Sequence, residues 1–219
     1  MPFPTVPCYR SLAPALALGA IVLGLAIVPA RADECSSGFT AVAEKMQNGP
    51  SAMPSFSAGI RVRARMHGFP FLGMTFNGTA TYERPGNYLL ALENLPRGAD
   101  KLEGFVHDLF ADITTSDHWS AYDVSAGCAV RGQLLVHMTP KVAGDVKSLD
   151  LVIDAVAAHV VKATFVREDG CVTIDQRFAT VDGHDVIVHQ DLGLAIAKAH
   201  ADIAADYHDI NLTTVVAGR

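Results

Sequence analysis

The nine histidines are the residues of this chain best suited to bind a metal ion or to move a proton near neutral pH. A zinc site needs ligands at short and regular spacings, such as two histidines one helical turn apart. No His-Glu-x-x-His sequence or comparable helical pair occurs. We therefore predict no metal site, and we interpret the histidines as scattered surface residues: His67, His107, His118, His137, His159, His184, His189, His200 and His208.

The serines and carboxylates indicate catalysis no more strongly than the histidines do. The Gly-x-Ser-x-Gly sequence that carries the nucleophile of many hydrolases is absent. A glycosidase needs two carboxylates that face one cleft, and Asp150 and Asp154 share a strand face in the way that many solvated pairs do. We predict no catalytic residue, no cofactor and a protein that is not an enzyme. A hydrolase whose site the sequence does not display is the less favoured alternative.

Cysteine chemistry depends on the compartment, which the first 32 residues predict. Arg10 precedes an apolar run over 12–28, and Ala30 and Ala32 are the small residues that signal peptidase reads. We predict a cleaved signal peptide over 1–32, export to the periplasm and one domain over 33–219; an uncleaved membrane anchor is the alternative. Export makes a disulfide plausible, and Cys128 and Cys171 are the candidate pair because each follows a glycine near a predicted strand.

The charge balance argues against nucleic acid as a partner. The predicted signal holds two of the 17 basic residues and none of the 23 acidic ones, so the remaining chain has a formal charge of −8. Nucleic-acid binding and anionic lipid surfaces both favour a basic patch.

The side chains of any functional site would have to be positioned mainly by β-strands. Residues 56–66 alternate apolar side chains with Arg61, Arg63 and Arg65, which indicates a strand with one buried and one wet face. Further strands are predicted at 74–84, 88–95, 119–124, 133–138, 149–155, 160–166, 171–180 and 186–189, with loose alternation over 196–216.

Two segments are predicted to be helical. Residues 39–46 favour a short N-terminal helix, and the apolar residues of 102–113 recur at the spacing of an amphipathic helix. The resulting fold class is mainly β (α+β), with an antiparallel barrel or half-barrel favoured over a sandwich, which would not explain the inserted helix. The apolar faces indicate either a closed core or a cavity with the helix as its lid, and the apolar loop over 69–72 favours the mouth of a cavity.

A resemblance rests on the strand and corner around Arg84. Gly78, Tyr82, Arg84, Pro85 and Tyr88 resemble the signature of the LolA/LolB-like periplasmic lipoprotein-carrier superfamily. Looser matches are Trp119 with Tyr122, and the strands over 149–154 and 178–183. The resemblance implies an open antiparallel half-barrel whose concave apolar face accepts acyl chains without catalysis. Tyr88-Leu89-Leu90 stands where those carriers tend to have Arg-Trp, so the cargo could be a free lipid, a glycolipid or another hydrophobe.

Together these features predict non-enzymatic binding or transport of a lipid-like ligand in the periplasm. The expected partners are an acyl-chain ligand, an envelope protein as donor or acceptor, and peripheral contact with a membrane; a protein-interaction or sensor module without lipid is the alternative. Arg84, Pro85 and Gly86 are predicted to form a structural corner. The predicted cavity or lid residues are Phe69, Phe71, Leu72, Leu102, Phe105, Val106, Leu109, Phe110 and Trp119.

Overall fold

The computed structural model describes residues 32–48, 53–67, 73–84, 87–94, 118–126, 131–197 and 199–212. These residues form one α-helix, one short 3-10 helix and ten strands that join in a single antiparallel sheet. The elements are α1 (Ala32–Asn48), β1 (Phe56–Met66), β2 (Gly73–Glu83), β3 (Asn87–Leu92), η1 (His118–Ala121), β4 (Tyr122–Ala126), β5 (Gln133–Pro140), β6 (Val146–Asp154), β7 (His159–Arg167), β8 (Gly170–Val181), β9 (His184–Ile196) and β10 (Ala199–Leu212).

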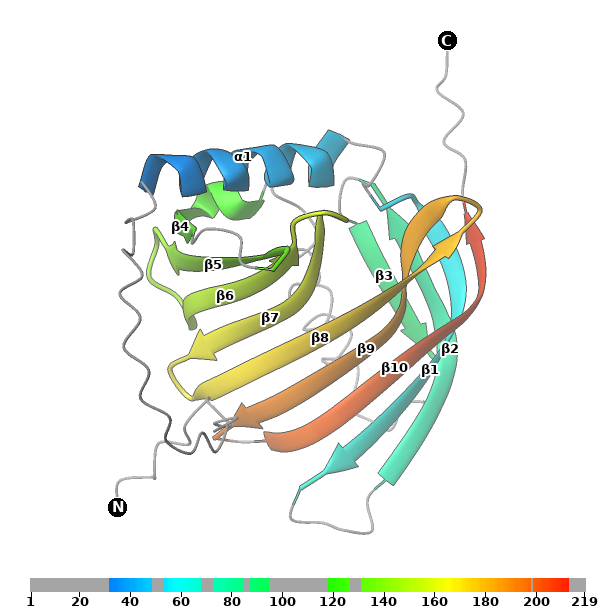
Figure 1. The fold of residues 1–219 in the computed structure, drawn as a ribbon. Coiled ribbons are helices and arrows are strands. Elements are labelled where there is room, and N and C mark those ends of the chain that lie inside the picture. The colour runs from blue at the N-terminus through cyan, green and yellow to red at the C-terminus, as the bar shows by residue number, and fades with distance from the viewer. Residues whose placement is uncertain are drawn as a thin grey trace, which may run out of the picture.

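The sheet is open, and its strand order is β3-β2-β1-β10-β9-β8-β7-β6-β5-β4. Successive strands of the chain are neighbours in the sheet except β3 and β4, which lie at its opposite edges, and β1 pairs with β10 in the middle. Figure 1 shows the sheet bent into an open trough, with α1 lying across it near β4 and β5. The two edge strands, β3 and β4, follow one another in the chain, so residues 95–117 connect the two edges.

The two faces of the sheet differ because polar and apolar residues alternate along each strand. In β1, Phe56, Ile60 and Val62 are buried, whereas Arg61 and Arg63 between them are exposed. Strand pairing places residues of one face opposite residues of the same face, so this division continues from strand to strand. We call the face with the buried apolar residues the inner face and the opposite one the outer face.

One apolar cluster on the inner face joins α1 to β4–β8. Phe39 and Val42 of α1 contact it, and the ring of Phe39 stacks on Trp119 with centroids 5.6 Å apart. Trp119 is 4% exposed, so the indole anchors η1 beneath the helix. The strand side chains at its centre include Met138, Leu149, Leu151, Ile153, Phe165 and Val172.

A second apolar cluster fills the inner face at the other end of the sheet. Phe56 and Ile60 of β1 pack there with Tyr82 of β2 and Tyr207 of β10. Phe56 meets Tyr207 edge-on at a centroid distance of 6.4 Å, the arrangement that aromatic quadrupoles favour. Each end of the trough therefore has its own core.

The predicted mainly β, open half-barrel architecture with a short N-terminal helix is confirmed. The strand predicted over 119–124 is wrong at its start, because Trp119 lies in η1, where stacking on Phe39 fixes it. The strand predicted over 186–189 is too short, since β9 pairs with both β8 and β10 along most of its length despite Asp191 and Gly193. The predicted helix over 102–113 lies outside the described residues.

Two histidines depart from the predicted surface positions. His159 is 6% exposed, and its ring stacks on Phe178 with centroids 4.2 Å apart. The side chain of His189 is 12% exposed and lies between two carboxylates. The predicted surface position is therefore wrong for these two residues. His159 packs against an aromatic ring, and His189 contacts two acidic side chains.

Candidate functional site

The middle of the inner face carries apolar side chains that are only partly buried. Leu192 and Leu194 of β9 extend the first cluster, and Ile203 and Ala205 of β10 extend the second. The pairing of Leu192 with Ile203 and of Leu194 with Ala201 makes this surface continuous across the two strands. Apolar side chains therefore line the trough from one core to the other.

A row of polar side chains interrupts this apolar surface. The hydroxyl oxygens of Tyr88 and Tyr207 lie 2.9 Å apart, and the Tyr207 hydroxyl donates to the side-chain oxygen Oε1 of Gln190. Gln190 pairs with Gln176 on the neighbouring strand β8. We call Tyr88, Tyr207, Gln190 and Gln176 the polar row.

The contact between Tyr88 and Tyr207 in the polar row indicates that the sheet is strongly curved. Tyr88 is on edge strand β3 and Tyr207 is on β10, with β2 and β1 between them in the sheet. Their hydroxyls can meet only because the sheet bends back over its own inner face. The contact therefore links edge strand β3 to β10 across the second cluster.

Burial keeps both phenols neutral. Desolvation raises the pKa of Tyr88 to about 12, although the hydrogen bond with Tyr207 opposes that shift. Burial likewise raises the pKa of Tyr207 well above its ordinary value, and the neighbouring Tyr88 adds to the effect. Both hydroxyls keep their protons at physiological pH and act as hydrogen-bond donors.

The Arg84 corner ties the helix to the sheet. The main-chain N–H of Arg84 donates to the Oγ of Ser55 at 3.1 Å, and its guanidinium donates to the carbonyl of Gln47 at 2.6 Å. Gln47 lies in the last turn of α1, where carbonyl groups lack helical partners and attract cations. Arg84 thus has a structural role in the described part of the corner, and Pro85 and Gly86 lie outside the described residues.

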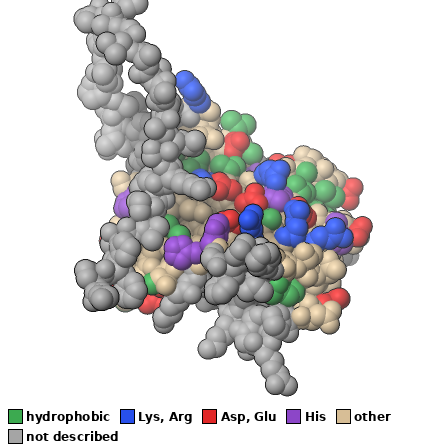
Figure 2. All heavy atoms as spheres, turned by 90° about the horizontal axis from the view of Figure 1, so that it is seen from below, with side chains coloured by type: hydrophobic (Ala, Val, Ile, Leu, Met, Phe, Trp, Pro, Cys, Tyr) green, Lys and Arg blue, Asp and Glu red, His purple; other side chains and the backbone are tan. Residues whose placement is uncertain are grey.

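The outer face is polar and carries a chain of charged side chains. Arg63 of β1 bonds Asp206 of β10 at 2.7 Å, and Asp206 bonds the Nδ1 of His189 at 2.6 Å. The hydrogen bond with His189 lowers the pKa of Asp206, and the Arg63 guanidinium lowers it further. The His189 Nε2 lies 3.0 Å from a carboxylate oxygen of Asp191 without hydrogen-bond geometry. Seen from below, basic, acidic and histidine side chains are intermixed (Figure 2).

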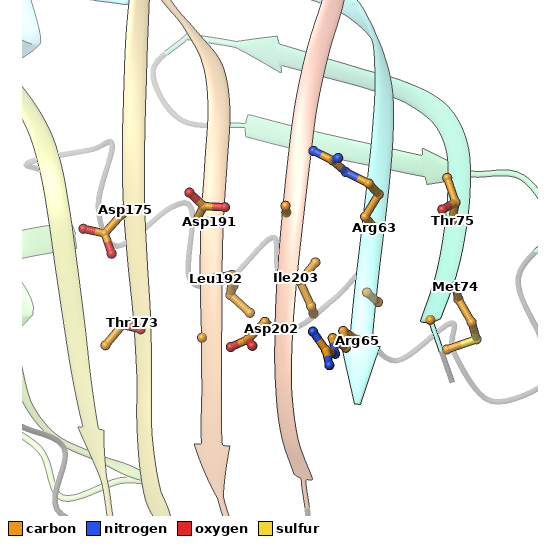
Figure 3. Close-up of a pocket in the computed structure, with 14 residues that line it drawn as sticks. Arg63, Arg65, Met74, Thr75, Thr173, Asp175, Asp191, Leu192, Asp202 and Ile203 are labelled. Carbon is orange, nitrogen blue, oxygen red and sulfur yellow. The ribbon is translucent and has the colours of Figure 1, made fainter. Parts of the chain in front are cut away.

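A shallow hollow of about 720 Å³ lies over β1, β2, β8, β9 and β10. Its charged and hydroxyl-bearing lining belongs to the outer face, and Figure 3 shows Arg63 and Arg65 on β1 beside Asp202 on β10 and Asp191 on β9. Such a lining is unsuited to a hydrocarbon chain, because an apolar ligand would desolvate charges without pairing them. Among the described residues, no group of three or more His, Cys, Asp or Glu side chains is placed to hold a metal ion.

Most of the predicted cavity and lid residues lie outside the described residues: Phe69, Phe71, Leu72, Leu102, Phe105, Val106, Leu109 and Phe110. Trp119 is described, and it belongs to the first cluster beneath α1. Cys171 is buried on β8, whereas its candidate disulfide partner Cys128 lies outside the described ranges. In the described part of the chain, no helix has the length and apolar character needed to cross a membrane.

The polar row was not predicted from the sequence. Gln176 has the same parity as Ile174, and Gln190 the same parity as Leu192, so the inner face of both glutamines is visible in the sequence. Their contact with Tyr207 and Tyr88 depends on the curl of the sheet, which the sequence pattern does not display.

Sequence comparison gives no match: no protein-family model fits the chain, and no curated protein resembles it. Solved structures do match. A LolA superfamily protein from Nitrosomonas europaea has a TM-score of 0.52 and 11% identity over 83% of this chain and 94% of its own. A domain described as an outer membrane lipoprotein-sorting protein, from Vibrio parahaemolyticus, has a TM-score of 0.59 and 9% identity over 84% of this chain and 94% of its own.

The fold is LolA-like. A DUF1329 family protein from Desulfovibrio piger shares it, with a TM-score of 0.54 and 12% identity over 84% of this chain and 95% of its own. Each match spans nearly the whole of the neighbouring structure. At these identities the likeness concerns the path of the chain and leaves the side chains to be argued from this structure.

Proposed function

We propose that this protein binds the hydrocarbon part of a lipid-like ligand on the inner face of its sheet, without catalysis. The observation that carries the proposal is the continuous apolar surface on β9 and β10, where Leu192, Leu194 and Ile203 are only partly buried. Burying such surface against an acyl chain is favourable by about 25 cal/mol for each Å² removed from water. The LolA-like fold supports this use of the trough, since one protein with that fold is described as sorting lipoproteins.

The proposed setting is the bacterial envelope. The predicted signal peptide over 1–32 supports export to the periplasm, and an envelope protein that delivers or receives the ligand would complete the function. Peripheral contact with a membrane would let a ligand exchange without a long path through water.

A pair of variants on β10 tests the proposed ligand face. Ile203 is on the inner face, and its neighbour Ala204 is on the outer face. Ile203→Asn should weaken binding of a fluorescent fatty-acid analogue about tenfold, because the amide would lie against hydrocarbon without a partner. Ala204→Asn introduces the same side chain on the wet face and should leave that affinity unchanged.

Extraction of the purified protein tests the same proposal without mutation. Solvent extraction followed by mass spectrometry should recover a lipid-like molecule in stoichiometric amount. A protein that carries no such molecule and binds no fatty-acid analogue would contradict the proposed function. Co-purification of a stoichiometric protein partner, again without lipid, would favour an interaction module instead.

A further inference from the structure

One side chain of the polar row has an unmet hydrogen bond. Gln176 is 6% exposed, and its amide nitrogen Nε2 has no hydrogen-bond partner. A buried amide donor without an acceptor costs free energy, whereas methionine or leucine would fill similar space without that cost. An unpaired donor at such a place therefore requires an explanation.

Gln176 lies where the two apolar clusters meet. On the inner face of β8 its neighbours are Ile174, which belongs to the first cluster, and Phe178, which packs against the second. Across the strand boundary it pairs with Gln190. Apolar side chains thus flank the amide in both directions along β8.

The other three side chains of the polar row bond one another. Tyr207 donates to Gln190 and contacts the hydroxyl of Tyr88, which fixes the orientation of these groups. The row contains no charged side chain, so it suits a neutral oxygen better than a carboxylate or phosphate. An acceptor that enters beside Gln176 would give its unpaired amide donor a partner.

We propose that the Nε2 of Gln176 donates a hydrogen bond to the carbonyl oxygen of an ester or amide in the ligand, with the attached hydrocarbon lying along the apolar surface on either side. This inference rests on the proposed function and adds a polar subsite to it. The ligand class that fits is a neutral acyl ester or acyl amide. A plain hydrocarbon fills the same trough but leaves the amide unpaired.

Two probes of equal length separate these ligand classes. The main chains of methyl tetradecanoate and hexadecane contain the same number of heavy atoms. The ester carries a carbonyl oxygen in addition, and hexadecane has none. Their affinities for the purified full chain are measured by displacement of a fluorescent dye from the apolar surface. The readout is the ratio of the ester affinity to the hexadecane affinity, because water expels hexadecane more strongly than the ester. A hydrogen bond to Gln176 should raise this ratio about three- to tenfold, the range that one neutral hydrogen bond supplies.

Gln176→Met removes the amide and keeps a flexible side chain of similar length. The variant should lower the ratio of ester to hexadecane affinity by the same factor, while its affinity for hexadecane stays the same or rises. Gln133→Met makes the same chemical change at an exposed position on the outer face of β5, and it should keep the wild-type preference.

The thermal stability of Gln176→Met is a second measurement. The proposed role and a purely structural role of the amide predict opposite changes in it. Without ligand, Gln176→Met should raise the midpoint of thermal unfolding, because it removes an unpaired buried donor. A lower midpoint would show that the amide supports the fold and would overturn the proposal. If the variant does not fold, the side-chain ¹⁵N–¹H resonance of Gln176 in the wild-type protein replaces it, and that resonance should shift with the ester and not with hexadecane.

The results of these experiments distinguish failure of the carbonyl subsite from failure of the proposed hydrocarbon-binding function. A ratio of ester to hexadecane affinity that Gln176→Met leaves unchanged would overturn the carbonyl subsite and leave the hydrocarbon-binding function intact. Absence of binding for both probes would contradict the function itself. A resonance that neither bound probe moves would indicate that water is the only partner of Gln176, which also overturns the subsite.

Discussion

The guanidinium of Arg84 donates to the main-chain carbonyl of Gln47 across 2.6 Å, which joins the end of β2 to the last turn of α1. A cation at this position lies beside a carbonyl of the last helical turn, at the negative end of the helix dipole. The Arg-Pro-Gly corner therefore does more than end a strand, because its first residue also holds the helix that covers the first cluster.

Replacing Arg84 with methionine should lower the free energy of unfolding by about 1 kcal/mol, a value discounted for the exposure of this contact. Urea denaturation measures the change. Arg61→Met alters an exposed arginine on the outer face of β1 and should change stability by less than about 0.5 kcal/mol. Equal effects of the two substitutions would show that the bond to Gln47 contributes nothing.

Gly78 allows β3 to approach β2 closely. A Cβ atom at this position would overlap the carbonyl oxygen of Ala91 and lie 2.9 Å from the Cα of Leu92. Both obstacles are backbone atoms of β3, so they cannot rotate away. Gly78→Ala should therefore destabilise the protein by about 1–3 kcal/mol, measured by thermal or urea unfolding.

The matched control for this change lies in the same strand. A Cβ at Gly73 would meet nothing within 4 Å, so Gly73→Ala should be close to neutral. A similar loss at both sites would mean that the glycines act through chain flexibility, and the steric explanation would then fail.

Local patterns predicted much of this fold. The alternation of Ile60 and Val62 with three arginines located β1 correctly because one face of that strand is buried and the other is wet. Gly78 entered only as one residue of the family signature, without a physical reason for a glycine there. The structure gives that reason, which is the close approach of the β3 backbone.

Long-range packing explains what the patterns did not predict. Trp119 looked like the start of a strand, but it stacks on Phe39, which is far away in the sequence. The meeting of Tyr88 with Tyr207 likewise requires the curl of four strands. Side-chain alternation reports which face a residue occupies, and it carries no information on which distant residue shares that face.

Asp206 links pH to stability on the acid side. Its hydrogen bond with His189 and the charge of Arg63 hold its pKa below the ordinary value of 3.8. A lowered folded-state pKa adds stability that is present above the unfolded value and is lost as pH falls through the folded value. Asp206→Asn should cost about 0.2–1 kcal/mol at pH 7, because the pair is partly exposed, and the cost should shrink as the pH falls below the ordinary pKa of 3.8. Urea titrations at pH 7 and at successively lower pH measure it, and a cost that persists unchanged in acid would exclude this linkage.

Tyr88 links pH to stability on the alkaline side, because burial raises its pKa from 10.0 to about 12. Between these values the unfolded chain has lost the proton that the folded protein keeps, so stability falls as pH rises, by up to about 1.4 kcal/mol per pH unit for one group. Tyr88→Phe should cost about 1 kcal/mol near pH 7 through loss of the hydroxyl contact with Tyr207. The same variant should lose stability less steeply than the wild type above pH 10, as measured by urea unfolding at several pH values. Parallel alkaline slopes for the two proteins would show that the Tyr88 hydroxyl is not desolvated in the folded state.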